Sequence, residues 1–450
     1  MKKLLVLGSI FLLLIAFYFG QIAYMGVLNE KLFKLQTSQN EFLTFTETSF
    51  EKGFFTSNAR FKAKIKADQY PLNQLSLSEA QELLSVEATV LFKNNIFAKN
   101  NAIMHFQSPI FDLIEELTNG DIKARDLIII KADLSLLGNV TVRAEVADLS
   151  YEEDYGSFKL TGLKSKGEFD LQGLMKKSSF ELSGFNYTES SSFIPFNFDL
   201  KELFYQEDYG KGVRLKDYLV GIVESKGALS VKSIELMDLQ LDGIKTSFES
   251  FLSKDDDKLL NANASIDINS INSSLANINL NKFKSEFELR NVSSQFLQDF
   301  YEQDINKLDT KDLAQNFFQS GASLSLNTLE FSSKDDKFNS KGELRGTNEG
   351  YKLSYEAQSS AVISEILPPL VLFGLNRFFV EKEGRYSLSL NLETDFKDYK
   401  LNVNGEELSF GFDEVEDEAL VDELFDDEVL LDDEAILEDE DYQPPLIELP

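Results

Sequence analysis

Apolar and polar residues alternate one by one along much of the chain. The alternation is clearest over residues 385–396, where serine, asparagine and glutamate separate the apolar positions. Those apolar positions are Tyr386, Leu388, Leu390, Leu392 and Phe396. The same pattern marks residues 59–67, 158–173, 178–187, 323–333, 338–346 and 400–410. A period of two is typical of a strand with one apolar face, so we expect an antiparallel sheet. The five apolar residues from Tyr386 to Phe396 could line a hydrophobic ligand.

Other segments have the spacing of amphipathic helices. They are residues 27–49, 76–85, 110–120 and 292–321. Residues 361–380 are also apolar, but Glu365 and the pair Pro368-Pro369 favour a buried or groove-lining helix over a membrane span. The sequence therefore predicts a β-rich α+β fold, with one or more elongated, curved antiparallel sheets and a few packed helices. No linker divides this body, which is longer than one core usually allows.

The N-terminus predicts a membrane anchor. Residues 4–26 are almost entirely apolar and follow Lys2 and Lys3. As a helix they would reach ~34 Å, enough to cross a bilayer, and no pair of small residues suits signal cleavage. The cations before the span place the N-terminus in the cytoplasm. We expect cytoplasmic residues 1–3, a transmembrane anchor (4–26), a juxtamembrane helix (27–49), a periplasmic β-rich body (50–412) and a tail (413–450).

Charge separates the tail from the body. The formal net charge is −32, and residues 413–450 hold 18 acidic residues and no Lys or Arg. We expect a solvated, mostly disordered tail; the alternative is a segment that docks on an envelope protein. The acidic balance argues against a nucleic-acid partner, because phosphate binding needs clustered cations.

Few residues could carry chemistry. The chain has no cysteine and one histidine, His105, which lies in an apolar segment typical of a structural role. No phosphate-binding loop or nucleophile motif occurs, so we expect no catalytic residue, metal or cofactor, and a non-enzymatic protein. Arg60, Lys62 and Lys64 alternate with apolar residues in segment 59–67. They would either stay solvated and protect a sheet edge, which we favour, or meet anionic lipid.

Three segments resemble a known family. The first follows the anchor and holds an aromatic residue, a basic residue, a glycine and a phenylalanine in order: Phe50, Lys52, Gly53, Phe55, Thr56 and Ser57. Residues 283–303 form a strand that runs into an aromatic-rich helix, and 395–410 form a strand pair with an Asn-Gly turn. In this order they resemble the YdgA-like bacterial inner-membrane-anchored proteins of unknown function, over about residues 1–410. The resemblance implies a bacterial inner-membrane location. No catalytic residues are established for that family, so the resemblance assigns none to this chain.

Gly53 also has a physical explanation. A glycine between a helix and a strand suits either a positive φ or a close backbone approach.

Two functional hypotheses follow, with a carboxylate-dependent hydrolase as a weaker third. The first is a periplasmic protein that binds or passes phospholipid along a β-sheet groove, similar in plan to AsmA-like lipid-bridge proteins. The second is an envelope scaffold that docks a partner through the tail. An open apolar groove would favour the first, a closed sandwich the second and a polar cleft the third.

Overall fold

The structure of the chain is a computed structural model. It describes residues 2–38, 43–65, 85–95, 97–117, 126–135, 139–153, 155–170, 172–190, 195–214, 223–254, 256, 258–297, 316–318, 321–347, 350–367, 375–395 and 398–408. The side chains of residues 2–17 lie outside this description. Residues 1–407 form one compact unit, and the predicted tail lies outside the described residues.

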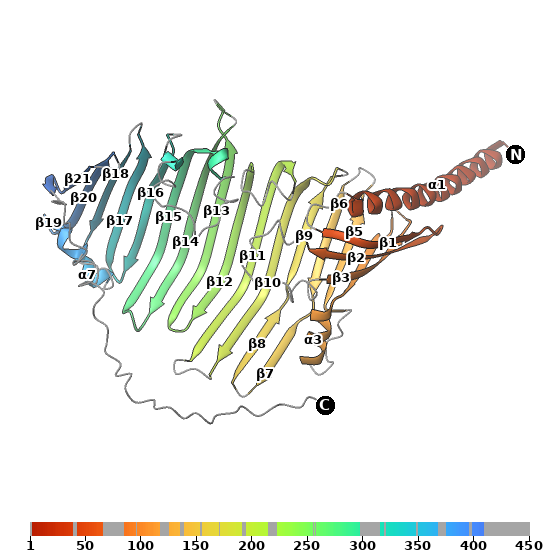
Figure 1. Cartoon of the computed structure of the whole chain (residues 1–450), viewed down its shortest axis with the longest axis horizontal. Helices are drawn as coiled ribbons and strands as arrows, with labels where there is room; N and C mark the ends of the chain where they lie inside the picture. The colour runs from red at the N-terminus through yellow and green to blue at the C-terminus, as the bar shows by residue number, and fades with distance from the viewer. Residues whose placement is uncertain are drawn as a thin grey trace, which may run out of the picture. The chain divides into compact units, whose positions relative to one another are not determined.

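The unit is built on one antiparallel sheet (Figure 1). Its strands are β1 (Leu43–Glu51), β2 (Thr56–Ile65), β3 (Ser85–Lys93), β4 (Ala102–Gln107), β5 (Ile128–Leu134), β6 (Val140–Val146), β7 (Leu149–Glu153), β8 (Gly156–Thr161), β9 (Lys164–Phe169), β10 (Met175–Glu189), β11 (Phe196–Val213), β12 (Ser225–Leu236), β13 (Leu239–Leu252), β14 (Leu259–Ser273), β15 (Ile278–Ser293), β16 (Ser323–Ser333), β17 (Asp336–Gly346), β18 (Tyr351–Ser359), β19 (Val380–Lys382), β20 (Arg385–Thr394), β21 (Tyr399–Val403) and β22 (Glu406–Leu408). The predicted sheet is confirmed, and it is single.

Strand order in space follows strand order in sequence. Each strand pairs with the next from β1 to β6 and from β9 to β18, and β20 and β21 continue the sheet. The hairpin β7–β8 is the exception, because β6 pairs with β9 while β8 and β9 both pair with β10. Successive turns therefore alternate between the two edges along which the strands begin and end.

The two faces of the sheet differ in polarity. One row of residues directly opposite one another is entirely apolar: Leu160, Phe185, Leu200, Ile234, Leu241, Ile271 and Leu280. The adjacent row, one residue along each strand, is entirely polar: Lys159, Asn186, Asp199, Glu235, Gln240, Asn272 and Asn279. Because neighbouring residues of a strand point to opposite faces, we call the face that carries Leu241 the apolar face.

A crease crosses the middle of the sheet. Four residues with positive φ lie on alternate strands or strand junctions: Gly162, Glu202, Gly243 and Lys282. Their partners by register on the strands between are Ser183, Lys232 and Asn269. We call this row the crease. Here the alternation between the two faces of the sheet shifts by one residue along each strand. In β11, for example, Leu200 before the crease and Leu203 after it lie on the apolar face, although they are three positions apart. Figure 1 shows the long strands curving along their length.

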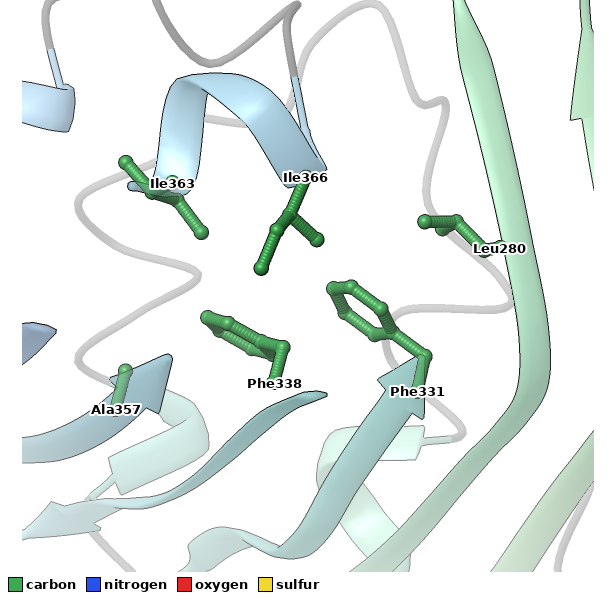
Figure 2. Close-up of a cluster of buried hydrophobic side chains, with 6 residues drawn as sticks. All are labelled: Leu280, Phe331, Phe338, Ala357, Ile363 and Ile366. Atoms are coloured by element: carbon green, nitrogen blue, oxygen red, sulfur yellow. The ribbon is translucent and has the colours of Figure 1, made fainter. Parts of the chain in front are cut away.

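Of the two clusters of buried hydrophobic side chains in the described residues, the larger lies under a short helix. Helix α7 (Ile363–Ile366) places Ile363 and Ile366 over the apolar face, against Phe331 and Phe338 (Figure 2). Leu280 and Ala357 complete this cluster. The predicted helix over residues 361–380 is therefore much shorter than expected, and residues 375–378 form a 3-10 turn. Ile363 and Ile366 are buried, as predicted, whereas Val380 is 41% exposed and residues 368–374 lie outside the described residues.

Helix α1 (Lys2–Ser38) includes the segment predicted as the anchor. Among the residues that the structure describes, no helix is long and apolar enough to cross a membrane. The predicted juxtamembrane helix over 27–49 is confirmed over residues 27–38 and wrong over residues 43–49, which belong to β1. Residues 39–42 lie outside the described residues. Threonines at alternate positions of that segment favour a strand, since β-branched side chains fit a pleated surface.

The remaining predictions concern three helices and the edge of the sheet that residues 59–67 were expected to protect. Helix α3 (Pro109–Leu117) confirms the helix predicted over 110–120. Of the helix predicted over 76–85, residues 76–84 lie outside the described residues and Ser85 begins β3. Only the ends of 292–321 are described; residues 294–297 and 316–318 are helical. The cationic strand β2 does not guard an edge, because it pairs with β1 on one side and β3 on the other.

Candidate functional site

The apolar face is continuous over most of the long strands. Beyond the crease, a row of leucines lies on six neighbouring strands: Leu289, Leu324, Leu344, Leu353, Leu392 and Leu401. We call this row the leucine ladder. It lies on the same face as the buried cluster, because Leu353 and Tyr355 alternate along β18 and Tyr355 packs on that cluster.

Much of this face is half-buried. In the apolar row, Leu160, Phe185 and Leu241 are partly exposed, and in the leucine ladder Leu324 is 41% exposed. An apolar sheet face normally packs against a second layer. Among the described residues, α7 covers this face near β15–β18. The remaining surface is a candidate site for a long hydrophobic ligand, because exposed apolar surface of this extent commonly marks a binding surface.

The five residues predicted to line a ligand share strand β20 only in part. Tyr386, Leu388, Leu390 and Leu392 lie on it, whereas Phe396 lies outside the described residues. Leu388 packs against the buried cluster, so it lies in a filled part of the face. Leu392 belongs to the leucine ladder, and Leu390 lies opposite Tyr355 and Val403. The predicted strand thus extends from the filled core to the half-exposed ladder.

The motif at residues 50–57 lies where α1 meets the sheet. The ring of Phe50 lies 5.7 Å from those of both Phe33 on α1 and Phe92 on β3. Lys52 Nζ lies 3.9 Å from the Glu30 carboxylate on α1. A methyl group on Gly53 would lie 2.1 Å from the Thr56 carbonyl oxygen, and its φ is not positive. Close backbone approach is therefore the reason for this glycine.

Asn94 joins the motif to α1. Its fully buried side chain donates from Nδ2 to the Gly53 carbonyl at 2.9 Å and to Ser57 Oγ at 3.0 Å. Its Oδ1 accepts a hydrogen bond of 3.1 Å from Asn29 Nδ2 on α1. A buried amide with both its donor and acceptor groups satisfied fixes the geometry of its neighbours. The motif residues Phe50, Lys52, Gly53, Phe55, Thr56 and Ser57 therefore belong to a structural joint, with Phe55 exposed at its surface.

A charged hollow lies on β1–β4. It has a volume of about 730 Å³ and is lined by His105, Arg60 and Lys62 among others. Lys62 Nζ lies 2.6 Å from Glu87 Oε1, and this hydrogen bond raises the pKa of Lys62 above its usual value. His105 is half-buried in β4 opposite Thr89. Within the described part of the chain, no group of acidic or histidine side chains could hold a metal ion.

Sequence reasoning missed Asn94 and most of the apolar rows. Asn94 and Asn29 are 65 positions apart, so only the folded chain reveals their contact. A signal existed in the polar pair Asn94-Asn95 directly after an apolar strand. The leucine ladder needs the register of six strands, which the sequence of one chain does not specify.

The geometry alone does not define a class of protein, but comparison with known families does assign the chain to one. The family described as "bacterial protein of unknown function (DUF945)" matches residues 1–339. The chain belongs to this family. Two of the three resembling segments, 50–57 and 283–303, lie inside the match, and 395–410 lies beyond it. No curated protein and no solved structure matches the chain.

Proposed function

We propose that this protein binds lipid acyl chains along the apolar face of its sheet, without catalysing a reaction. The supporting observation is the half-exposed apolar face, which extends from the row through Leu241 to the leucine ladder. The opposite face is polar and suits water. An acyl chain that leaves a bilayer for this face exchanges one apolar surrounding for another. Its transfer is then nearly balanced in free energy, which suits holding and releasing lipid.

We further propose the location that such a role needs. Residues 4–26 would anchor the chain in the bacterial inner membrane, with the N-terminus in the cytoplasm and the sheet in the periplasm. The YdgA-like assignment is a finer proposal than the family membership, and it rests on residues 50–57, 283–303 and 395–410. Phospholipid is the ligand class that an inner-membrane protein meets most often.

Photo-crosslinking in cells tests the lipid proposal. A photoreactive amino acid is placed at Leu241 or Leu344 on the apolar face, and at the adjacent Gln240 or Glu343 on the polar face as matched controls. Lipids are labelled with radioactive phosphate. We expect labelled adducts at Leu241 and Leu344 only, because neighbouring residues of one strand face opposite sides.

Two results would contradict the proposal. Equal labelling at Gln240 and Leu241 would indicate non-specific contact with membrane, and absence of labelled lipid at all four positions would exclude phospholipid on this face. A protein adduct at Leu344 in place of lipid would favour an envelope scaffold. Deletion of residues 413–450 would then show whether the tail recruits that partner.

A further inference from the structure

Large aromatic side chains are exposed where α1 meets the sheet. Six of them, between 41% and 64% exposed, come from three separate segments: Tyr18, Phe19, Tyr24, Phe54, Phe55 and Phe97. The rings of Phe19 and Phe54 lie 5.9 Å apart, and those of Phe54 and Phe55 lie 5.0 Å apart. Exposed aromatic side chains gathered in this way commonly mark an interaction surface. We call these six residues the aromatic seat.

The joint holds the three segments together. Asn95 Oδ1 accepts hydrogen bonds from Gln21 Nε2 at 3.4 Å and from the Phe97 backbone N–H at 3.0 Å. The Phe97 loop is thereby attached to α1. Asn94 attaches the Phe54 turn to the same helix, because it donates to the Phe54 carbonyl at 3.1 Å. The seat is therefore built on a folded support, and its rings keep their places relative to α1.

One face of α1 packs on protein from Gln21 onward. Ile22 and Met25 are fully buried, and Gln21 and Asn29 are nearly so. A methyl group on Gly26 would lie 3.1 Å from Asn94 Nδ2, so the helix approaches the sheet closely. Residues 21–26 cannot be surrounded by lipid on all sides. The anchor available to the hydrocarbon core thus ends near residue 20, which leaves 17 residues, about 25 Å of helix and close to the lower limit for a span.

The chemistry of the seat fits a membrane surface. Aromatic rings collect at the level of lipid head groups, where one part of the ring meets acyl chains and another meets water. Lys52 borders the seat, and the loop segment 93–101 carries Lys93 and Lys99 and no acidic residue. Cations at this position attract anionic lipid head groups. A binding surface for a soluble partner would have no reason to lie at the end of the apolar anchor.

We propose that the aromatic seat lies in the head-group layer of the bilayer at the point where α1 leaves it. The turn between β1 and β2 and the loop through Phe97 then contact lipid, and one edge of the sheet rests on the membrane. This inference rests on the proposed membrane anchor. It adds that the sheet is held against the bilayer, within reach of lipid, and not on a mobile stalk.

The chain has no tryptophan, so a single introduced tryptophan reports its own surroundings. The full-length protein would be placed in vesicles of phosphatidylethanolamine and phosphatidylglycerol that carry a quencher at a shallow or a deep acyl position. Phe54→Trp and Phe97→Trp test the seat, and Phe11→Trp tests the anchor. Leu275→Trp is the control, because Leu275 is 86% exposed in a turn at the opposite edge of the sheet.

We expect the shallow quencher to reduce the fluorescence of Phe54→Trp and Phe97→Trp at least about twofold more than that of Leu275→Trp. The deep quencher should act most on Phe11→Trp. If only Phe11→Trp is quenched, the anchor holds and the seat is wrong. If no variant is quenched, both the anchor and the seat are wrong. If Phe54→Trp emits at shorter wavelength without quenching by lipid, a second copy of the protein covers the seat, which also overturns the proposal.

Discussion

Gly53 allows the chain to turn from β1 into β2 beneath α1. A side chain at this position would meet the Thr56 carbonyl oxygen at 2.1 Å, a separation that no ordinary contact permits. The carbonyl belongs to backbone that is paired in β2, so it cannot move without disturbing the strand. The turn around Gly53 also supplies two of the carbonyl groups that Asn94 binds. One small residue therefore supports the whole joint.

Gly53→Ala should lower the free energy of unfolding by about 2 kcal/mol or more, because the new methyl group must displace backbone. Gly20→Ala is the matched control: nothing lies within 4 Å of that methyl group, and alanine favours a helix. Thermal unfolding of both variants in one detergent measures the difference. Equal midpoints for the two variants would show that the turn adapts and that close approach does not explain Gly53.

Asp238 joins two neighbouring turns through its carboxylate. The Ser273 hydroxyl donates to it at 2.5 Å, the Ser274 hydroxyl also donates, and the Leu275 N–H donates at 2.9 Å. These donors favour the ionised form and lower the pKa of Asp238 to about 2, from an ordinary value of 3.8. The pairing of the β12–β13 turn with the β14–β15 turn therefore depends on a charged group.

The stabilisation by Asp238 should be present at any pH above its ordinary pKa of 3.8 and should disappear as the pH falls toward 2. NMR of the side-chain carboxyl carbon would follow its titration directly. Asp238→Asn should remove this part of the pH dependence while it keeps the shape of the side chain. A midpoint near 4 for Asp238 would mean that the three hydrogen bonds do not persist in solution.

At the scale of the elements, the crease allows long strands to curve while one face stays apolar. A residue with positive φ reverses the local geometry of its strand, and it is costly for any residue except glycine, by roughly 1–2 kcal/mol. The crease uses glycine at Gly162 and Gly243, but Glu202 and Lys282 at its other two positions. Glu202 forms an exposed ion pair with Lys232, whose Nζ lies 2.5 Å from its carboxylate, and a pair of this kind offsets little of the strain.

Lys282→Gly should raise the free energy of unfolding by about 0.5 kcal/mol, because relief of the backbone strain exceeds the added freedom of the unfolded chain. Lys284→Gly, two residues along the same strand in ordinary β conformation, should lower it by about 1 kcal/mol. Urea unfolding of both variants gives the comparison. Destabilisation by both substitutions to the same extent would indicate that Lys282 carries no strain.

The crease also explains which strands could be predicted from the sequence. Residues 323–333 were predicted as a strand and match β16, and the predicted sheet with an apolar face is confirmed. Strand β11 was missed, because the pair Lys201-Glu202 at the crease shifts its alternation from even to odd positions. A pattern of fixed period fails at such a shift. The candidate site was predicted only on β20, since the rows across strands depend on pairing and register.

At the scale of the whole unit, the sheet repeats every two strands: each hairpin adds one pair of residues to the apolar row, to the polar row and to the crease. Strands β11 and β14 are separated by β12 and β13, and in the apolar row Leu200 and Ile271 are separated by Ile234 and Leu241. Two adjacent strands form one hairpin and return the chain to the same edge. Positive-φ residues also repeat on alternate strands, at Glu202 and Gly243 for example. If one hairpin is removed, the apolar and polar residues of the two strands that flank it can therefore still pair with residues of the same kind.

Deletion of residues 225–258, which removes β12 and β13, should leave a shorter sheet that folds, with Leu200 opposite Ile271. Deletion of residues 239–258 removes β13 alone and would require β12 and β14 to run in the same direction without a crossover. We expect that protein to be unfolded or insoluble, since parallel neighbours need a long connection. Circular dichroism and the sharpness of thermal unfolding distinguish the outcomes. Equal loss of structure in both deletions would show that the sheet is not built of independent hairpins.

The order of the strands also has a consequence for how the protein is made. A chain that emerges gradually, N-terminus first, presents β2 after β1 and β3 after β2, and each finds its partner already formed. No strand from β10 to β18 has to wait for one made much later. Contacts between near neighbours also close small loops and favour rapid folding. The sheet can therefore grow along its length during synthesis or export, with one new strand added to its growing edge at each step.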